Sequence, residues 1–206
     1  ADTQLIAWDW GWADAWAADA IQQLPGGIAL MSVSEWSIPI RRGGIDSVVG
    51  EYSISTIGPG PRARRHWALA RERGLKTIAK IQAGNTWELS AVPYIPAVEN
   101  VARHAANLLR SQVDGIMLGW TLGGYPSPNL EVVAELAGAG ESVPRKVGVT
   151  ENSSEATPHE AMLQVAQRRF GKVLAPAVVQ VWRECSAAFS ECPFHAGLVY
   201  SAPLQL

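Results

Sequence analysis

The chain has 206 residues, of which 17% are charged and 48% are hydrophobic, and its formal net charge is −2. This composition predicts a folded domain with a full core and argues against a disordered segment. The slight acidity argues against a nucleic-acid-binding protein, because no excess of Lys or Arg is available to neutralise phosphates. No apolar run reaches the length of a membrane span, and the start of the sequence does not have the pattern of a signal peptide, so we expect neither.

The two cysteines and the chain ends bear on the cellular compartment. Cys185 and Cys192 are seven positions apart on a predicted helix, which is too far for a disulfide if the helix is intact. Free thiols slightly favour the cytoplasm, where thiols stay reduced. Because the chain has no initiator Met and ends in an apolar tail, we expect a processed or truncated chain, and a secreted parent stays open.

Predicted strands and helices alternate along the first 150 residues. Strands are predicted at Leu5–Trp12, Ile28–Trp36, Glu51–Ile57, Thr77–Ile81 and Asp114–Trp120. Helices are predicted at Asp14–Leu24, Arg62–Arg73, Val98–Leu109 and Asn129–Leu136. Residues 37–50 have no helical period, and Arg41-Arg42-Gly43-Gly44 marks a turn. The alternation predicts an α/β protein with a parallel sheet.

A barrel fits the pattern better than an open sheet. Doubly wound sheets concentrate their site at one switch point and usually show a glycine-rich phosphate turn after the first strand. Here, acidic and indole residues end strand after strand, as at Asp9-Trp10 and Glu35-Trp36. We therefore predict a parallel (β/α) barrel, or a partial TIM barrel, as a catalytic region over residues 1–150.

Residues 151–206 predict trailing helices that pack on this barrel. Two amphipathic helices are expected, at Pro158–Phe170 and Ala175–Phe189. Thr157 is the expected N-cap of the first, with Pro158 at its first position and Glu160 at its third, which is a capping-box arrangement.

Three carboxylates stand at predicted strand ends: Asp9, Glu35 and Glu88. Glycoside hydrolysis needs two such groups, one to protonate the leaving oxygen and one to attack the sugar or activate water. Glu88 is the preferred acid, because the adjacent Trp87 would desolvate it and favour its protonated form. The alternatives are a helix-cap or ion-pair role for Glu88, a solvated loop position for Glu35, and a strand-end acceptor role for Asp9.

Aromatic and polar residues near these ends are candidate substrate contacts. Indole rings stack on sugar rings through their faces, although any Trp also serves as a core residue. Lys80 shares a strand face with Gln82 and is expected to orient a carboxylate or a sugar hydroxyl, unless it points outward over apolar surface. The predicted substrate-binding residues are Trp10, Trp36, Lys80, Asn85, Trp87, Trp120 and Tyr125.

Several other kinds of site are disfavoured. The four His residues have no paired metal-ligand spacing, so we expect no metal. Neither a Walker motif nor a Rossmann fingerprint occurs, and we expect no cofactor. The nucleophile elbow of Ser hydrolases is also missing.

Three long stretches carry a family resemblance: VGEYSISTIGPGPRARRHWALARERGLKTIAKIQAGNTWELSAVPYIP, DGIMLGWTLGGYPSPNLEV and ECPFHAGLVYSAPLQ. They resemble a mostly uncharacterised group of large bacterial proteins that are similar to (β/α)₈ glycoside hydrolases, with some likeness to hexosaminidase-like enzymes. The resemblance implies that the chain corresponds to the carboxyl-terminal half of a catalytic barrel with its trailing helices.

The group's motifs fall on particular positions of this chain. Asn-Thr-Trp-Glu falls on residues 85–88, Gly-Trp-Thr-Leu-Gly-Gly-Tyr on 119–125 and Ser-Glu-Trp on 34–36. Gly84 stands where a second Asn is expected. An Asp-Glu pair of the hexosaminidase kind is absent from the sequence, so the resemblance does not extend to substrate-assisted chemistry.

The sequence thus predicts a glycosidase that acts on a carbohydrate through a pair of carboxylates. A non-catalytic carbohydrate-binding or vestigial barrel fragment is the alternative, and a structural domain with core Trp residues is a third. An incomplete barrel leaves open sheet edges, which predicts a dimer or higher oligomer.

Overall fold

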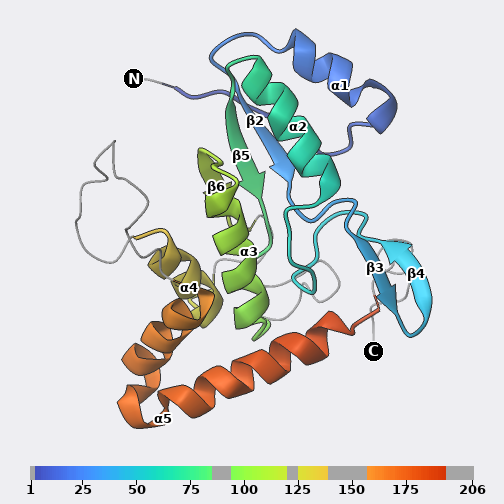
Figure 1. The fold of residues 1–206 in the computed structure, drawn as a ribbon. Coiled ribbons are helices and arrows are strands. Elements are labelled where there is room, and N and C mark those ends of the chain that lie inside the picture. The colour runs from blue at the N-terminus through green and yellow to red at the C-terminus, as the bar shows by residue number, and fades with distance from the viewer. Residues whose placement is uncertain (1–2, 85–93, 120–124, 139–156, 194–206) are drawn as a thin grey trace.

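The main sheet has four parallel strands in the order β1-β2-β5-β6, of which β2, β5 and β6 are labelled in Figure 1. The computed structural model describes residues 3–84, 94–119, 125–138 and 157–193. The sheet consists of β1 (Ile6–Trp8), β2 (Ala29–Val33), β5 (Lys76–Lys80) and β6 (Gly115–Met117). Each strand runs parallel to its neighbour. The predicted α/β class with a parallel sheet is therefore confirmed.

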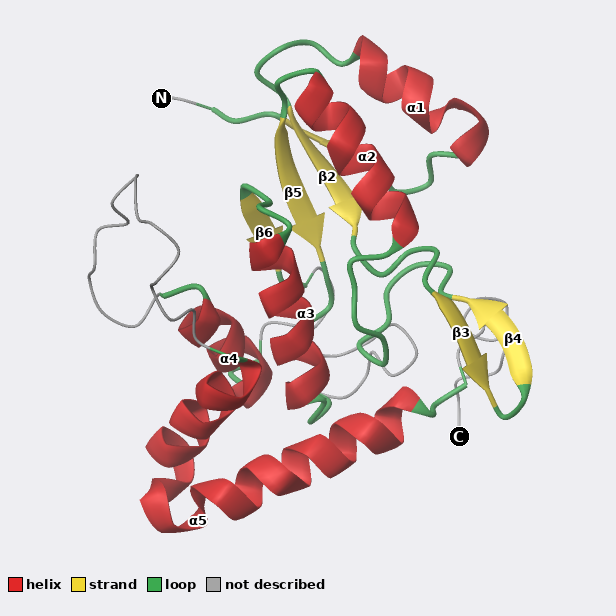
Figure 2. Cartoon of the chain, in the orientation of Figure 1, coloured by secondary structure: helices red, strands yellow, loops and turns green. Residues whose placement is uncertain are grey.

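A helix follows each parallel strand in the chain (Figure 2). These helices are α1 (Asp14–Gln23), α2 (Pro61–Glu72), α3 (Val98–Arg110) and α4 (Pro128–Leu136). All four were predicted, with bounds that differ by no more than one residue. In α3, Val98, Val101, Ala102 and Ala105 are buried, and their spacing of three to four residues places them on one side of the helix.

The prediction of a strand at Glu51–Ile57 is wrong. The structure has turns there, and residues 52–56 are buried within them. The hydroxyls of Ser53 and Ser55 lie 2.5 Å apart, and the Thr56 hydroxyl donates to the Ser53 carbonyl at 3.1 Å. Such local hydrogen bonds compete with a strand ladder. Without this strand, β2 connects to β5 through α2, and the strand–helix repeat is regular.

An antiparallel hairpin occupies most of the region between β2 and that buried loop. It consists of β3 (Pro39–Arg42) and β4 (Ile45–Val48). Gly43 and Gly44 join the strands with φ values of 56° and 80°, as a two-residue hairpin turn with left-handed backbone requires. The predicted turn is confirmed, whereas its flanking strands were not predicted.

The last described element, α5 (Pro158–Ser190), contains both predicted C-terminal helices. Gly171 separates them with a non-helical backbone at φ 80° and ψ 160°. The predicted capping box is confirmed: Thr157 Oγ1 accepts from the Glu160 amide at 3.2 Å, and the Glu160 carboxylate accepts from the Thr157 amide at 2.8 Å. The α5 helix packs on α3 and α4. The predicted boundary near residue 150 lies outside the described residues.

The sheet has two distinguishable faces. Strand residues in the hydrophobic core, among them Leu30, Ala79 and Ile81, all point to the same side because side chains alternate along a strand. We call this side the helix face, since the core packs it against the helices. The side that carries Val33, Lys80 and Met117, which are register partners, is called the opposite face.

Candidate functional site

The parallel sheet gathers several predicted site residues at one edge. Because all four strands point the same way, the residues after β1, β2, β5 and β6 meet at their carboxyl ends, where α/β proteins place ligands and catalytic groups. Asp9, Glu35 and Gln82 lie just beyond these ends and are buried. Whether they act together depends on which face each side chain occupies.

A carboxylate and an amine lie together on the opposite face, in a group that we call the Glu35–Lys80 cluster: Glu35, Tyr52, Lys80 and Gln82. Glu35 is 1% exposed, and its Oε1 accepts a hydrogen bond from the Gln82 amide at 3.3 Å. Lys80 is fully buried, and its Nζ lies 5.0 Å from the centroid of the Tyr52 ring. The structure thus brings the predicted residues Glu35 and Lys80 together.

Burial changes the ionisation of Lys80. It lowers the pKa of the Lys80 ammonium from 10.5 to about 8, while the Glu35 carboxylate opposes this by stabilising the charged form. Among the described residues, Lys80 Nζ has no hydrogen-bond partner. A buried amine of this kind costs stability, which is typical of groups retained for a ligand or for chemistry.

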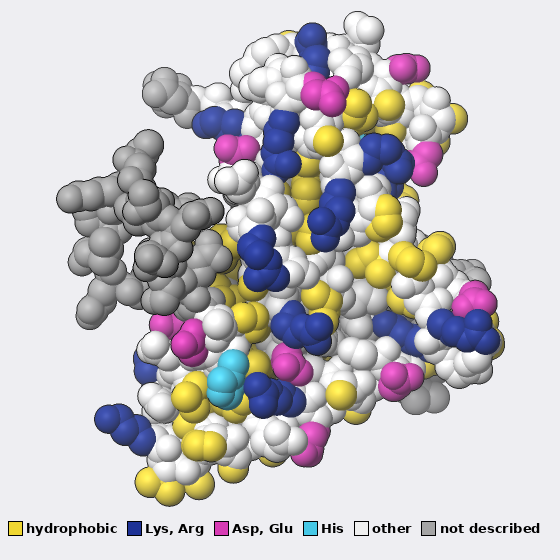
Figure 3. Space-filling view, in the orientation of Figure 1, with side chains coloured by type: hydrophobic (Ala, Val, Ile, Leu, Met, Phe, Trp, Pro, Cys, Tyr) yellow, Lys and Arg dark blue, Asp and Glu magenta, His cyan; other side chains and the backbone are white. Residues whose placement is uncertain are grey.

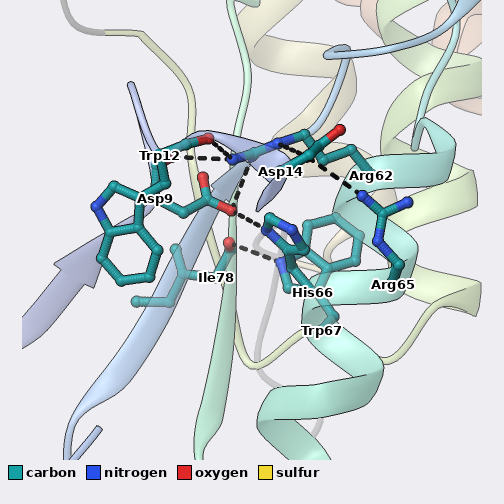
Figure 4. A network of polar contacts seen from close by, with 8 residues as sticks. All are labelled: Asp9, Trp12, Asp14, Arg62, Arg65, His66, Trp67 and Ile78. Atoms are coloured by element: carbon teal, nitrogen blue, oxygen red, sulfur yellow. Dashed lines mark hydrogen bonds and ion pairs between the residues drawn. The ribbon is translucent and has the colours of Figure 1, made fainter. Parts of the chain in front are cut away.

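Asp9 belongs to a separate cluster on the helix face (Figure 4). Its Oδ2 accepts from His66 Nδ1 at 2.6 Å and forms an ion pair with Arg62 Nη1 at 3.1 Å. Arg62 Nη2 also donates to the carbonyls of Asp9 at 3.2 Å and Trp12 at 2.8 Å. Since these contacts tie the end of β1 to α2, the Asp9–Arg62–His66 cluster holds the scaffold. Its contacts support the strand-end acceptor alternative, and Asp9 does not face Glu35.

A second buried polar pair on the helix face is also structural. The Ser34 hydroxyl lies 2.7 Å from His104 Nε2, and burial lowers the pKa of His104 to about 3, which keeps its imidazole neutral. Gly58 packs against this pair, where a Cβ atom would lie 2.4 Å from His104 Nε2. The site is closed, so we assign it to packing.

Two of the predicted indoles lie on different sides of the sheet. Trp10 is 44% exposed, and its ring centroid lies 5.7 Å from that of Trp8, whose register partner Met31 is on the opposite face. In contrast, the Arg62 guanidinium lies 4.5 Å from the centroid of the Trp36 ring, so Trp36 contacts the helix side. Trp10 and Trp8 are thus better placed than Trp36 to accompany the Glu35–Lys80 cluster.

An aromatic pair lies on the loops after β5 and β6. The rings of Tyr94 and Tyr125 stack with centroids 6.0 Å apart and planes 6° from parallel, and both side chains are exposed. Tyr125 was predicted, whereas Tyr94, Trp8 and Tyr52 were not. Because side chains alternate along β1, Trp8 could have been predicted to share a face with Trp10. Tyr52 could not, because residues 51–57 were predicted to form a strand.

Some predicted site residues lie outside the part of the chain that the structure describes, and their roles stay predictions. They are Asn85, Trp87, Glu88 and Trp120.

Within the described ranges, other kinds of site find little support. No group of three or more His, Cys, Asp or Glu side chains there is arranged to hold a metal ion. None of the helices in that part combines the length and the apolarity that crossing a bilayer requires. Cys185 and Cys192 are free in the structure, and Cys192 lies past the end of α5 rather than on the same helix as Cys185.

Fold and site together define an α/β protein with a buried carboxylate–amine cluster at the carboxyl edge of a parallel sheet. Comparisons with protein-family models, curated proteins and solved structures find no match to the chain. The function is therefore inferred from the chemistry of the site itself.

Proposed function

We propose that the chain is part of a (β/α) barrel glycoside hydrolase in which Glu35 is one of two catalytic carboxylates. The observation that carries this proposal is the burial of Glu35 beside Lys80, at the carboxyl edge and on the face away from the helices. In a barrel, that face lines the interior, and the carboxyl edge is the catalytic end.

Each carboxylate has a distinct role. The Lys80 ammonium stabilises the ionised form of Glu35, which suits it to attack the anomeric carbon or to take a proton from water. Glu88 follows β5 in the sequence and is the proposed acid that protonates the glycosidic oxygen. The exposed Trp10, with Trp8 behind it, offers an indole face to a sugar ring.

A carbohydrate-binding fragment without turnover is the second candidate. It is favoured by the exposed, stacked pair of Tyr94 and Tyr125, because aromatic faces bind sugars without any catalytic group. On this proposal, Glu35 and Lys80 serve as hydrogen-bonding groups for sugar hydroxyls.

Kinetics on a panel of nitrophenyl glycosides tests the first candidate. Glucosides, galactosides and N-acetylhexosaminides would be hydrolysed by the wild-type protein, and the Glu35→Gln and Glu88→Gln variants would each lose about 10²–10⁴-fold in rate. Glu72→Gln is the matched control, since this exposed carboxylate lies on α2, and its rate should equal that of the wild type.

The remaining outcomes separate the two candidates. No turnover by the folded wild-type protein, with Trp fluorescence quenched by sugars, would favour the binding fragment. An unchanged rate in Glu35→Gln would remove Glu35 from the mechanism. If the protein showed no turnover and sugars did not quench its Trp fluorescence, both candidates would be wrong, and the Trp residues would be core residues.

The same proposal includes self-association. β1 and β6 are the edges of the sheet, and Ile6 and Met117 on its opposite face are 49% and 41% exposed. Open edges and apolar faces invite pairing, and two copies of four strands match the eight of a usual barrel. We expect a dimer or higher oligomer by light scattering; a monomer at micromolar concentration would contradict this.

A further inference from the structure

A cavity of about 450 Å³ lies between α2 and α3, apart from the Glu35–Lys80 cluster. The α2 helix contributes Arg64, Trp67 and Arg71, and Trp67 is almost fully buried. Asn107, Arg110 and Gln112 line the other side, from the end of α3 and the turn after it. Because α2 packs on the helix face, this cavity lies on the outside of the sheet layer.

The charge around the cavity is of one sign. Three guanidinium groups line it and no carboxylate does. In the described part of the chain, none of the three forms an ion pair, whereas Arg62 and Arg65 of the same α2 helix pair with aspartates. Figure 3 shows Lys and Arg side chains running down the middle of the visible face of the molecule.

Neutral acceptors position these guanidinium groups. Arg64 Nε donates to the Pro59 carbonyl at 3.0 Å, Arg71 Nη2 to the Ser111 carbonyl at 2.6 Å and Arg110 Nη2 to Asn107 Oδ1 at 2.5 Å. A neutral acceptor orients an arginine without cancelling its charge. Since each guanidinium has five N–H donors, several remain for an anion.

We propose that this cavity binds a small organic phosphate, such as a sugar phosphate, through the dianion of its phosphate monoester. Planar guanidinium groups match phosphate oxygens in bidentate geometry. The side-chain amide of Gln112 suits the hydroxyl groups of the rest of the molecule, whereas the amide of Asn107 already bonds to Gly58 and Arg110. The volume falls within the range of about 300–1,000 Å³ that is usual for small-molecule sites. This inference is independent of the proposed hydrolase activity.

Isothermal titration calorimetry with three probes tests the proposal. Glucose 6-phosphate is expected to bind saturably at one site per chain, inorganic phosphate more weakly, and glucose not at all. Arg71→Gln and Arg110→Gln should each weaken binding of glucose 6-phosphate by about tenfold, because each removes a charged hydrogen-bond donor. Arg103→Gln is the control: it removes the same charge from an exposed position of α3 outside the cavity and should leave the affinity unchanged.

Three outcomes would overturn the proposal. The first is the absence of saturable binding of glucose 6-phosphate at millimolar concentration. The second is an equal loss of affinity in Arg103→Gln, which would indicate general surface electrostatics. The third is equal affinity for inorganic phosphate and glucose 6-phosphate, which would show that no organic group is recognised. Circular dichroism of the variants, all at exposed positions, confirms that they are folded.

Discussion

Asp9-Trp10 and Glu35-Trp36 are the same kind of dipeptide at the ends of neighbouring strands, yet they face in opposite directions. Asp9 contacts α2, while Trp10 lies beside Trp8 on the opposite face. Glu35 lies with Lys80 on the opposite face, and Trp36 packs under Arg62 of α2. The parallel register explains this, since Asp9 and Glu35 differ by an odd number of steps along paired strands, and one step reverses the face.

The two clusters also differ in how their charges are satisfied. On the helix face, Asp9 has both an ion pair and a hydrogen bond, and Arg62 bonds to backbone carbonyls as well. On the opposite face, Lys80 Nζ is buried without a hydrogen bond to any described residue. Asp9 Oδ1 also has no hydrogen-bond partner among the described residues, but the Asp9 charge is paired. A cluster whose charges are paired holds the fold together, whereas a buried charge without a hydrogen bond is better explained by function. Variants that remove one charge from either cluster test this comparison.

The largest effect on stability is expected for Asp9→Asn. It would leave the buried Arg62 with only the largely exposed Asp14 as a countercharge, and breaking a buried pair costs about 3–5 kcal/mol. Urea denaturation at pH 7 measures the free energy of unfolding. Glu35→Gln should cost much less, because the neighbouring Lys80, with its lowered pKa, can release its proton when the carboxylate is lost.

Asp46→Asn is the matched control for this experiment. Asp46 pairs with Arg41 on the hairpin, but both side chains are largely exposed, so the same substitution there should cost less than about 1 kcal/mol. If Asp9→Asn and Glu35→Gln lowered stability by equal amounts, the division into a structural and a functional cluster would be wrong.

The helices and the parallel sheet could be predicted because their signals are local and periodic. In α3, apolar residues recur every three to four positions, and Thr157 and Glu160 carry their capping box in the sequence itself. The turn of the hairpin was predicted because two adjacent glycines mark it. The prediction of a strand at residues 51–57 was wrong because alternating Ser and Ile residues are also typical of strands. In the structure, the serine hydroxyls bond to each other within a buried loop.

The division of the site into two clusters could not be predicted. It depends on register between strands that lie more than twenty residues apart in the sequence, and a one-residue change in register exchanges the faces. The partners of Asp9 come from α2, and Tyr52 reaches Lys80 from the wrongly assigned segment. Glu35 and Lys80 were both predicted as site residues, but their contact is a tertiary feature.

A smaller effect, of opposite sign, is expected for Lys80→Met. At pH 7 the folded protein carries Lys80 mostly as the ammonium, and the cost of burying this charge exceeds its attraction to Glu35. A neutral methionine of similar size should therefore stabilise the folded state. Each unit by which the pKa is lowered corresponds to about 1.4 kcal/mol of stability. Allowing for solvent screening, we expect the free energy of unfolding of Lys80→Met to exceed that of the wild type by about 2 kcal/mol at pH 7. Urea denaturation from pH 7 to pH 10.5 provides the measurement.

The pH dependence distinguishes this effect from ordinary repacking. Between pH 8 and pH 10.5, the unfolded wild-type chain keeps the lysine proton that the folded chain has released. Wild-type stability therefore rises relative to Lys80→Met with increasing pH, and the advantage of the variant disappears near pH 10.5. Lys76→Met, at the exposed start of the same strand, should show no such trend. If the stability gain of Lys80→Met stayed constant over this pH range, packing alone would be responsible for it. The cost of a buried ammonium would then not distinguish the Glu35–Lys80 cluster from the Asp9 cluster.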